Sequence, residues 1–285
     1  MPTRRWLAPA VGLGAVALAA GTSATAFAAA PHAAAPHVVA GAQTATRAAH
    51  HLRSRGDVLL PSGAHHLGQV SAAHHDGKVI LHDTSDNWAG YAATGGSYTS
   101  VASNWVQPSV DCGSEDTYSS FWVGLDGDGT DSVEQTGTEA DCSGGQAQYS
   151  AWYEMYPAYP VTYGDDVEPG DSMSASVTTD GQGNFTLTLT DDTEGWTETQ
   201  NQYSSSAQDG SAEIIAEAPY SNGVLPLSDF GTADFTGSTV NGSPLGDSGP
   251  DSIDLVSDGG TTEATTSGLD SSGEDFSVTW DSSGS

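Results

Sequence analysis

Short runs of alternating apolar and polar residues recur from about residue 83 to the end of the chain, separated by clusters of Gly, Asp, Asn and Ser. The clearest runs lie at 147–156, 173–177, 185–189, 212–217, 253–255 and 276–280. A period of two is typical of a strand with one buried face, and no run shows the spacing of a helix. The pattern predicts an all-β, antiparallel sandwich or barrel. Residues 241–275 are rich in Gly, Ser, Asp and Thr, which predicts loops around weak strands.

Alternation also assigns side chains to faces. In the run 121–126, the apolar residues Phe121, Val123 and Leu125 share the face expected to point into the core. The opposite face of this run and of three others carries aromatic, carboxyl and amide groups: Trp122, Gly124 and Asp126; Val133 and Gln135; Trp152, Glu154 and Tyr156; Glu213, Ile215 and Glu217. A solvated face is ordinarily polar, but aromatic rings grouped with polar groups indicate a binding groove.

The first 28 residues have the three parts of a secretory signal peptide. Arg4 and Arg5 supply the positive charge, residues 6–20 form the apolar run, and Ala26-Phe27-Ala28 is a small-x-small cleavage site. The apolar run is too short to span a bilayer, and no other membrane candidate follows. We therefore expect a secreted, extracellular protein.

Charge divides the rest of the chain into two segments. All six Lys and Arg and all nine His precede residue 83, where only Asp57 and Asp76 are acidic. The remaining 35 of the 37 acidic residues lie in 83–285, which has no basic residue. We interpret 29–82 as a cationic, His-rich, poorly structured pro-segment that docks on the acidic domain 83–285 as its intramolecular inhibitor and chaperone. The paired His residues also allow a metal-binding tract.

The composition of 83–285 restricts its chemistry. Without His, this segment cannot contain a Ser-His-Asp triad, a Cys-His pair or a His-ligated zinc site. Without Lys or Arg, it lacks a Schiff-base lysine and a cationic clamp for an oxyanion. Catalysis there must use carboxyl, amide, hydroxyl or backbone groups, and we expect neither a metal nor a cofactor.

The formal net charge of −31 bears on partners and on working pH. A surface this acidic repels the phosphates of nucleic acids and of anionic membranes, so we expect neither as a partner. Within 83–285 no salt bridge can form, and carboxylate repulsion fades only as the pH falls toward 4. We expect a monomer that works in acid; a surface tuned for solubility, as in halophiles, is the alternative.

Cys112 and Cys142 are the only cysteines. In a secreted protein, two cysteines are expected to form a disulfide. Closing a loop of this size contributes about 3–4 kcal/mol in the loop-entropy model. Two buried thiols are the alternative.

Five motifs occur along the acidic segment: Asn87-Trp-Ala-Gly90, Trp122-Val-Gly-Leu-Asp-Gly127, Gln135-Thr-Gly137, Ala151-Trp-Tyr-Glu-Met-Tyr-Pro157 and Ala212-Glu-Ile-Ile-Ala-Glu217. Jointly they resemble the glutamic peptidases, or eqolisins, over roughly residues 86–240, and the run 276–280 also fits. The resemblance implies two packed antiparallel sheets, a β-sandwich of the concanavalin A-like or jelly-roll type. It also implies a zymogen with a cationic pro-segment, which becomes an endopeptidase acting on protein or peptide substrates in acid, without a metal.

The same resemblance implies the site residues. The catalytic dyad is Gln135 and Glu217, and the positions that match the family's substrate cleft are Trp88, Trp122, Asp126, Trp152, Glu154 and Tyr156. An ionised Glu217 would take a proton from the attacking water and return it to the leaving nitrogen. Gln135 would donate an amide N–H to the developing oxyanion, a role worth about 2.7–4 kcal/mol in comparable enzymes.

Several alternatives stay open. Glu213 is a rival base, because it lies about 14 Å from Glu217 on the same strand face and both cannot serve one site. Glu154 and Glu217 could be the paired carboxyl groups of a glycoside hydrolase whose tryptophans stack on sugars. A carbohydrate-binding domain without catalysis is a third possibility. The acidic turn 126–131 resembles a calcium loop but lacks the spacing and glutamate of an EF-hand, so we interpret it as a Gly-rich turn.

Overall fold

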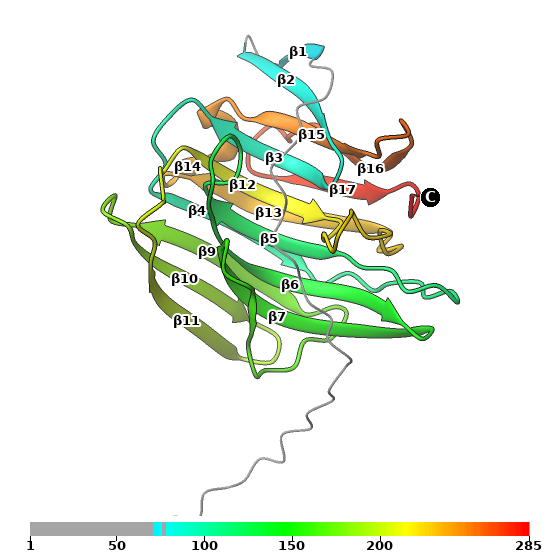
Figure 1. Cartoon of the computed structure of the whole chain (residues 1–285). Helices are drawn as coiled ribbons and strands as arrows, with labels where there is room; N and C mark the ends of the chain where they lie inside the picture. The colour runs from blue at the N-terminus through cyan, green and yellow to red at the C-terminus, as the bar shows by residue number, and fades with distance from the viewer. Residues whose placement is uncertain (1–70, 76–77, 285) are drawn as a thin grey trace, which may run out of the picture. The chain divides into compact units, whose positions relative to one another are not determined.

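The structure is a computed structural model that describes the backbone of residues 71–75 and 78–284, and side chains from residue 82 onward. These residues form seventeen strands and one short 3-10 helix, Leu245–Ser248. Strand pairing is antiparallel except between β2 and β15, which confirms the predicted all-β, antiparallel fold (Figure 1). No helix in this described part is long and apolar enough to cross a bilayer.

The proposed signal peptide 1–28 and most of the proposed pro-segment 29–82 lie outside the described residues. The end of the pro-segment is an exception, because β1 (Ser71–His75) and β2 (Lys78–Ser85) form an antiparallel pair. Strand β2 also runs parallel to β15 (Asp251–Val256). The prediction of poor structure is wrong for these strands, since the edge of β15 offers backbone groups with which β2 can pair.

Hydrogen bonding arranges the strands in two groups. The first has the order β1-β2-β15-β3-β12-β5-β6-β7-β8, and its further members are β3 (Trp88–Thr94), β12 (Ser211–Glu217), β5 (Ser120–Leu125), β6 (Val133–Ser143), β7 (Gln146–Tyr156) and β8 (Val161–Thr162). The second has the order β16-β17-β13-β4-β9-β10-β11, with bounds Thr262–Thr266, Phe276–Trp280, Thr232–Val240, Ser100–Val106, Ser172–Thr179, Asn184–Asp191 and Trp196–Tyr203. The pair β15–β16 joins the two groups, and β14 (Ser243–Pro244) pairs with β13.

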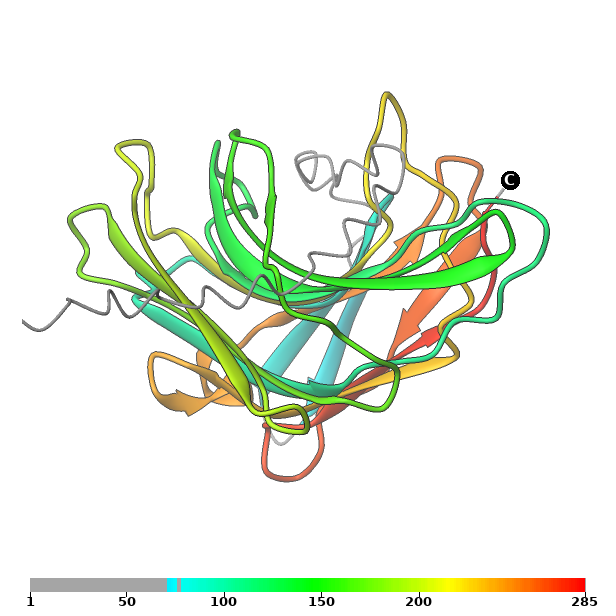
Figure 2. The same ribbon diagram turned by 90° about the horizontal axis from the view of Figure 1, so that it is seen from below.

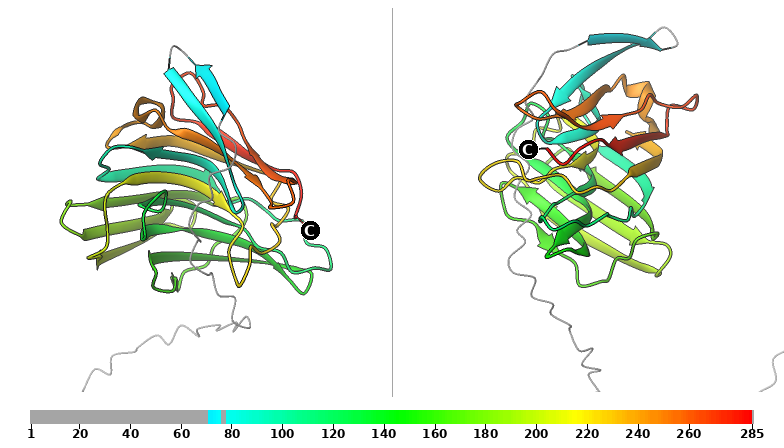
Figure 3. Two further views of the ribbon diagram at one scale, coloured as in Figure 1. Left: turned by 45° about the horizontal axis from the view of Figure 1, so that its top comes forward. Right: turned by 90° about the vertical axis from the view of Figure 1, so that its right-hand side faces the viewer.

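The two groups share one hydrophobic core. Phe121, Val123 and Leu125 of β5 are fully buried in it, as the alternation predicts, together with Trp105 of β4 and Leu187 of β10. Side chains from both groups therefore meet in this core. Figures 2 and 3 show the two layers of strands from three directions. The other face of the first group of strands does not contribute to this main core.

That opposite face carries a second, smaller hydrophobic cluster. Its members are Trp88, Ala92, Trp122, Val133, Trp152, Ile215 and Ile253, with Tyr156 packed against them. Most of these residues come from the face on which the sequence predicts a binding groove. The candidate site is built around this cluster.

Two further predictions can be checked in the fold. Cys112 and Cys142 form the expected disulfide, with Cα atoms 5.4 Å apart, which ties the segment before β5 to the end of β6. The six clearest predicted runs all lie within strands, and the run 276–280 coincides with β17. The segment 241–275 contains β14, β15 and β16 between its loops, in agreement with the predicted weak strands.

Candidate active site

Strand register brings the separate motifs together. Strand β5 lies between β12 and β6, so that Gly124 is opposite Glu213 on one side and opposite Gln135 on the other. Gln135 is in turn opposite Glu154 of β7. Four residues from four strands thus form one row across the sheet, with a glycine between Glu213 and Gln135.

Glu217 lies in a parallel row, four residues along β12 from Glu213. It is opposite Trp88 of β3 and Ser120 of β5. Because four is an even number, Glu217 and Gln135 share a face of the sheet. The predicted dyad therefore lies on the two strands that flank β5, on the side opposite the main core.

The carboxyl group of Glu217 is held by two donors. Asn87 donates from Nδ2 to Oε1 at 3.0 Å, and Trp122 donates from Nε1 to Oε2 at 2.8 Å. The Trp122 ring lies edge-on to Trp88, with ring centroids 5.2 Å apart. Only 4% of Glu217 is exposed. These neighbours fix the direction of the carboxyl group.

Burial, and to a smaller extent the negative charge of Glu154, raise the pKa of Glu217 to about 8. Hydrogen bonds from Trp122, Trp88 and Asn87 act in the opposite direction, because each stabilises the carboxylate. Desolvation outweighs them in this buried site. Any process that lets water reach Glu217 removes the main cause of the increase.

Gln135 and Glu154 form the second part of the site. The amide nitrogen Nε2 of Gln135 donates to Oε2 of Glu154 at 2.6 Å, and both side chains are almost fully buried. Burial raises the pKa of Glu154 to about 8, while the hydrogen bond from Gln135 lowers it. Glu154 has this one side-chain donor, whereas Asn87 and Trp122 both donate to Glu217, so the carboxylate form of Glu217 is stabilised by more hydrogen bonds.

Asp126 does not join these residues. Its carboxylate is fully buried and accepts backbone N–H bonds from Gln208, Asp209 and Gly210 at 2.7–3.1 Å. The alternation rule fails here, because β5 ends at Leu125 and Asp126 has a left-handed φ of 65°. Asp126 thus holds a loop beside the site, and the cleft position that the resemblance implies for it stays a prediction.

The remaining predicted cleft residues are in the second cluster. Trp88, Trp122 and Trp152 are buried, and Tyr156 is partly exposed at its border. The indole N–H of Trp152 donates a hydrogen bond to none of the described residues. The aromatic side chains thus border the acidic and amide groups, and all of them except Tyr156 are covered.

Glu213, the rival base, lies in the same row as Gln135 and is fully buried. Its Oε1 accepts the backbone N–H of Asp128 at 3.4 Å, and burial raises its pKa well above the usual value. Its register position keeps it a candidate. Its surroundings favour a proton more strongly than those of Glu217, which accepts side-chain hydrogen bonds from Asn87 and Trp122.

Asn87 is a functional candidate that the sequence analysis did not single out. The Asn-Trp motif included it, but nothing in a single sequence shows that residues 130 positions apart share a hydrogen bond. The contact of Trp122 with Glu217 was hidden in the same way, because it depends on the register of β5 against β12.

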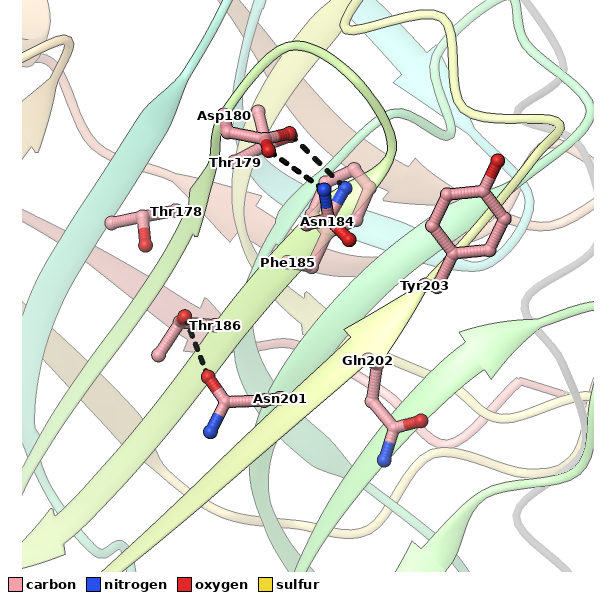
Figure 4. A pocket seen from close by; sticks show the side chains of 9 residues that line it. All are labelled: Thr178, Thr179, Asp180, Asn184, Phe185, Thr186, Asn201, Gln202 and Tyr203. Atoms are coloured by element: carbon pink, nitrogen blue, oxygen red, sulfur yellow. Dashed lines mark hydrogen bonds between the residues drawn. The ribbon is translucent and has the colours of Figure 1, made fainter.

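An open groove also lies on the second group of strands, away from the two rows (Figure 4). It is lined by Thr178, Thr179, Asp180, Asn184, Phe185, Thr186, Asn201, Gln202 and Tyr203. Asp180 is the only acid in this lining, and hydrogen bonds from Asn184 and Gln182 lower its pKa. A single ionised carboxylate does not provide paired acid and amide groups, so this groove is not the candidate active site.

Comparison with known proteins identifies the family of this chain. The model of the Peptidase A4 family matches residues 86–280. Aspergillopepsin-2 of Aspergillus niger is 30% identical over 213 residues, which are 65% of this chain and 75% of that protein. Scytalidopepsin B of Scytalidium lignicola is 35% identical over 105 residues, or 35% of this chain and 39% of that protein.

Solved structures of glutamic peptidases are also similar to this chain. Scytalido-glutamic peptidase with a transition-state analogue matches with a TM-score of 0.58 and 27% identity, over 69% of this chain and 98% of that chain. Aspergilloglutamic peptidase from Aspergillus niger matches with a TM-score of 0.52 and 30% identity, over 58% of this chain and 99% of that chain. With a family match over residues 86–280 and these relatives, the chain belongs to the Peptidase A4 family and is a glutamic-type endopeptidase.

Proposed function

We propose that this protein is a secreted, monomeric acid endopeptidase that uses Glu217 as general base and Gln135 as oxyanion donor. The two packed layers of strands support a sandwich of the concanavalin A-like or jelly-roll type. The observation that carries the proposal is the hydrogen-bonded Glu217 carboxyl group on the same sheet face as the Gln135 amide. The predicted signal peptide 1–28 supports secretion.

The reaction follows from these groups. A water molecule attacks the scissile carbonyl carbon, and Glu217 takes its proton as the new C–O bond forms. The carbonyl oxygen becomes negatively charged and accepts an N–H bond from Gln135. Glu217 then gives the proton to the peptide nitrogen and the C–N bond breaks, which yields a carboxylic acid and an amine. Gln135 suits acid conditions because its amide does not titrate.

Access to the site is part of the proposal. Glu217, Gln135 and Glu154 are each at most 4% exposed, so a substrate can reach them only after the site is uncovered. We assign the covering role to the cationic segment 29–82, which would be attracted to the acidic domain at neutral pH and released as carboxylates gain protons. Uncovering the site hydrates Glu217, lowers its pKa and makes its carboxylate form available in acid.

Three variants test the assignment: Glu217→Gln, Gln135→Ala and Glu213→Gln. Each is made in the full chain, acidified, and assayed at about pH 3 on a denatured protein. We expect the first two to lose at least about 100-fold in kcat and Glu213→Gln to retain most activity. The same samples are assayed on polysaccharide, since a glycoside hydrolase would tolerate the loss of Gln135. Near-normal proteolysis by both Glu217→Gln and Gln135→Ala would refute the dyad.

A further inference from the structure

We propose that Glu154 is a positioning residue, whose carboxyl group holds the Gln135 amide in the one orientation that presents N–H to the substrate. The resemblance to known peptidases places Glu154 among the residues that line a substrate cleft. The structure instead gives it a direct contact with Gln135. The inference rests on the proposed function, because orienting Gln135 matters only if its amide stabilises the oxyanion.

An amide donor needs such a partner because its two ends are opposite in character. Rotation about the last side-chain bond of glutamine exchanges the NH₂ group with the carbonyl oxygen, and this torsion has broad, roughly two-fold preferences. In one orientation Gln135 offers N–H to a developing oxyanion. In the other it offers oxygen, which would repel that charge. Some neighbour must therefore select between the two.

Glu154 meets this requirement by its position and chemistry. It lies opposite Gln135 in the β6–β7 pair, and Nε2 of Gln135 is 2.6 Å from Oε2 of Glu154. A flipped amide would place its oxygen against that acceptor oxygen. Since Gln135 and Glu154 are only 1% and 3% exposed, water cannot readily relieve such a contact.

One acid from another element interacts with Glu154 within the described part of the chain. It is Glu217 of β12, whose pKa the negative charge of Glu154 raises.

A double-mutant cycle tests the inference with Glu154→Leu, Gln135→Leu and the pair together, assayed on a peptide substrate at about pH 3.5. If Glu154 acts through Gln135, Glu154→Leu lowers kcat by about 100-fold, as for loss of an oxyanion donor, and changes KM less than about threefold. The kcat of the double variant is then no lower than that of Gln135→Leu alone, because both substitutions remove the same interaction with the oxyanion.

Glu154→Gln provides the matched variant that keeps the shape of the side chain. Its amide can accept from Nε2 of Gln135 and donate to Oε1, so we expect at least about a third of the kcat of the wild-type protein. Glu154→Asp, one methylene shorter, keeps the acid but loses the contact, and we expect a fall in kcat like that of Glu154→Leu. This variant also serves if Glu154→Leu does not fold, which near-ultraviolet circular dichroism would show.

The outcomes separate the two proposals. If Gln135→Leu retains wild-type kcat, the proposed dyad is wrong. If Gln135→Leu is inactive but Glu154→Leu and Glu154→Asp retain wild-type kcat, the dyad stands and the positioning role is wrong. Losses that multiply in the double variant, or a change confined to KM, would show that Glu154 contacts the substrate directly and would also overturn the inference.

Discussion

At the scale of single residues, hydrogen-bond donors decide which of two buried carboxyl groups can act as a base. Glu217 and Glu154 are both glutamates with a pKa raised to about 8 by burial. Asn87 and Trp122 donate to Glu217, which stabilises its charged form. The one side-chain donor to Glu154 is the Gln135 amide that Glu154 positions. The different environments assign different tasks to identical side chains.

Trp122→Phe tests this reasoning. Phenylalanine keeps an aromatic ring in the cluster but has no N–H for Oε2 of Glu217, so the carboxylate loses a donor and the pKa of Glu217 rises. A hydrogen bond to a charged group contributes about 1.5–3 kcal/mol, which corresponds to a change of about one to two units in the pKa of that group. We expect the acid limb of the pH profile of kcat/KM to move upward by about one unit.

Trp152→Phe is the matched control for that measurement. Its indole nitrogen has no hydrogen-bond partner among residues 82–284, so losing it leaves the midpoint of the acid limb unchanged, whatever happens to KM. An unshifted profile for Trp122→Phe would mean that the donor does not control the ionisation of Glu217.

At the scale of secondary structure, β5 and β6 must approach closely for the site to form. Gly137 of β6 lies between Trp122 on one neighbouring strand and Trp152 on the other. A Cβ atom at Gly137 would lie 2.6 Å from Cβ of Trp122 and would collide with the backbone oxygen of Phe121. Glycine here makes room for the ring that holds Glu217.

Gly137→Ala should therefore destabilise the protein and displace Trp122. Both contacts involve atoms that cannot rotate away, so the strands must separate, and overpacking of this kind costs about 1–3 kcal/mol. Urea unfolding at pH 4 measures the loss. Gly164→Ala is the control, since a Cβ atom there meets nothing within 4 Å. Equal stability of the two variants would contradict the proposed close contact.

At the scale of the whole molecule, buried acids make the folded state depend on pH. Burial raises the pKa of Glu134, Glu154 and Glu217 to about 8, against about 4.5 in a solvated chain. A group whose pKa is higher in the folded state stabilises it fully below the unfolded value. This contribution is lost as the pH rises toward the folded value. Repulsion among 35 surface and buried carboxylates of residues 83–285 acts in the same direction.

The melting temperature of the full chain should accordingly be higher at pH 4 than at pH 7.5, by at least about 5 °C. Scanning calorimetry at several pH values checks the sign. Glu134→Gln removes one of the buried acids outside the active site, and its melting temperature should depend less steeply on pH. A melting temperature that rises between pH 4 and pH 7.5 would show that these acids are already ionised in the folded protein.

The sequence predicted much of the fold because strand alternation is local. The runs around Phe121 and Phe276 are read correctly from residues that are neighbours in the chain, since burial on one face imposes a period of two. The same rule failed at Asp126, where the backbone leaves the strand with a left-handed φ. The poor structure predicted for 29–82 does not hold for β1 and β2, because the place of β2 depends on the distant edge of β15.

By itself, the sequence determined the class of fold, the disulfide and the range of available chemistry. These follow from periodicity, from two cysteines, and from the absence of His, Lys and Arg in residues 83–285. Only the tertiary structure decided that Asn87 and Trp122 hold Glu217, and that Glu154 binds Gln135. The reason is register: a hydrogen bond depends on which residues of distant strands lie opposite one another, and the whole sheet fixes this.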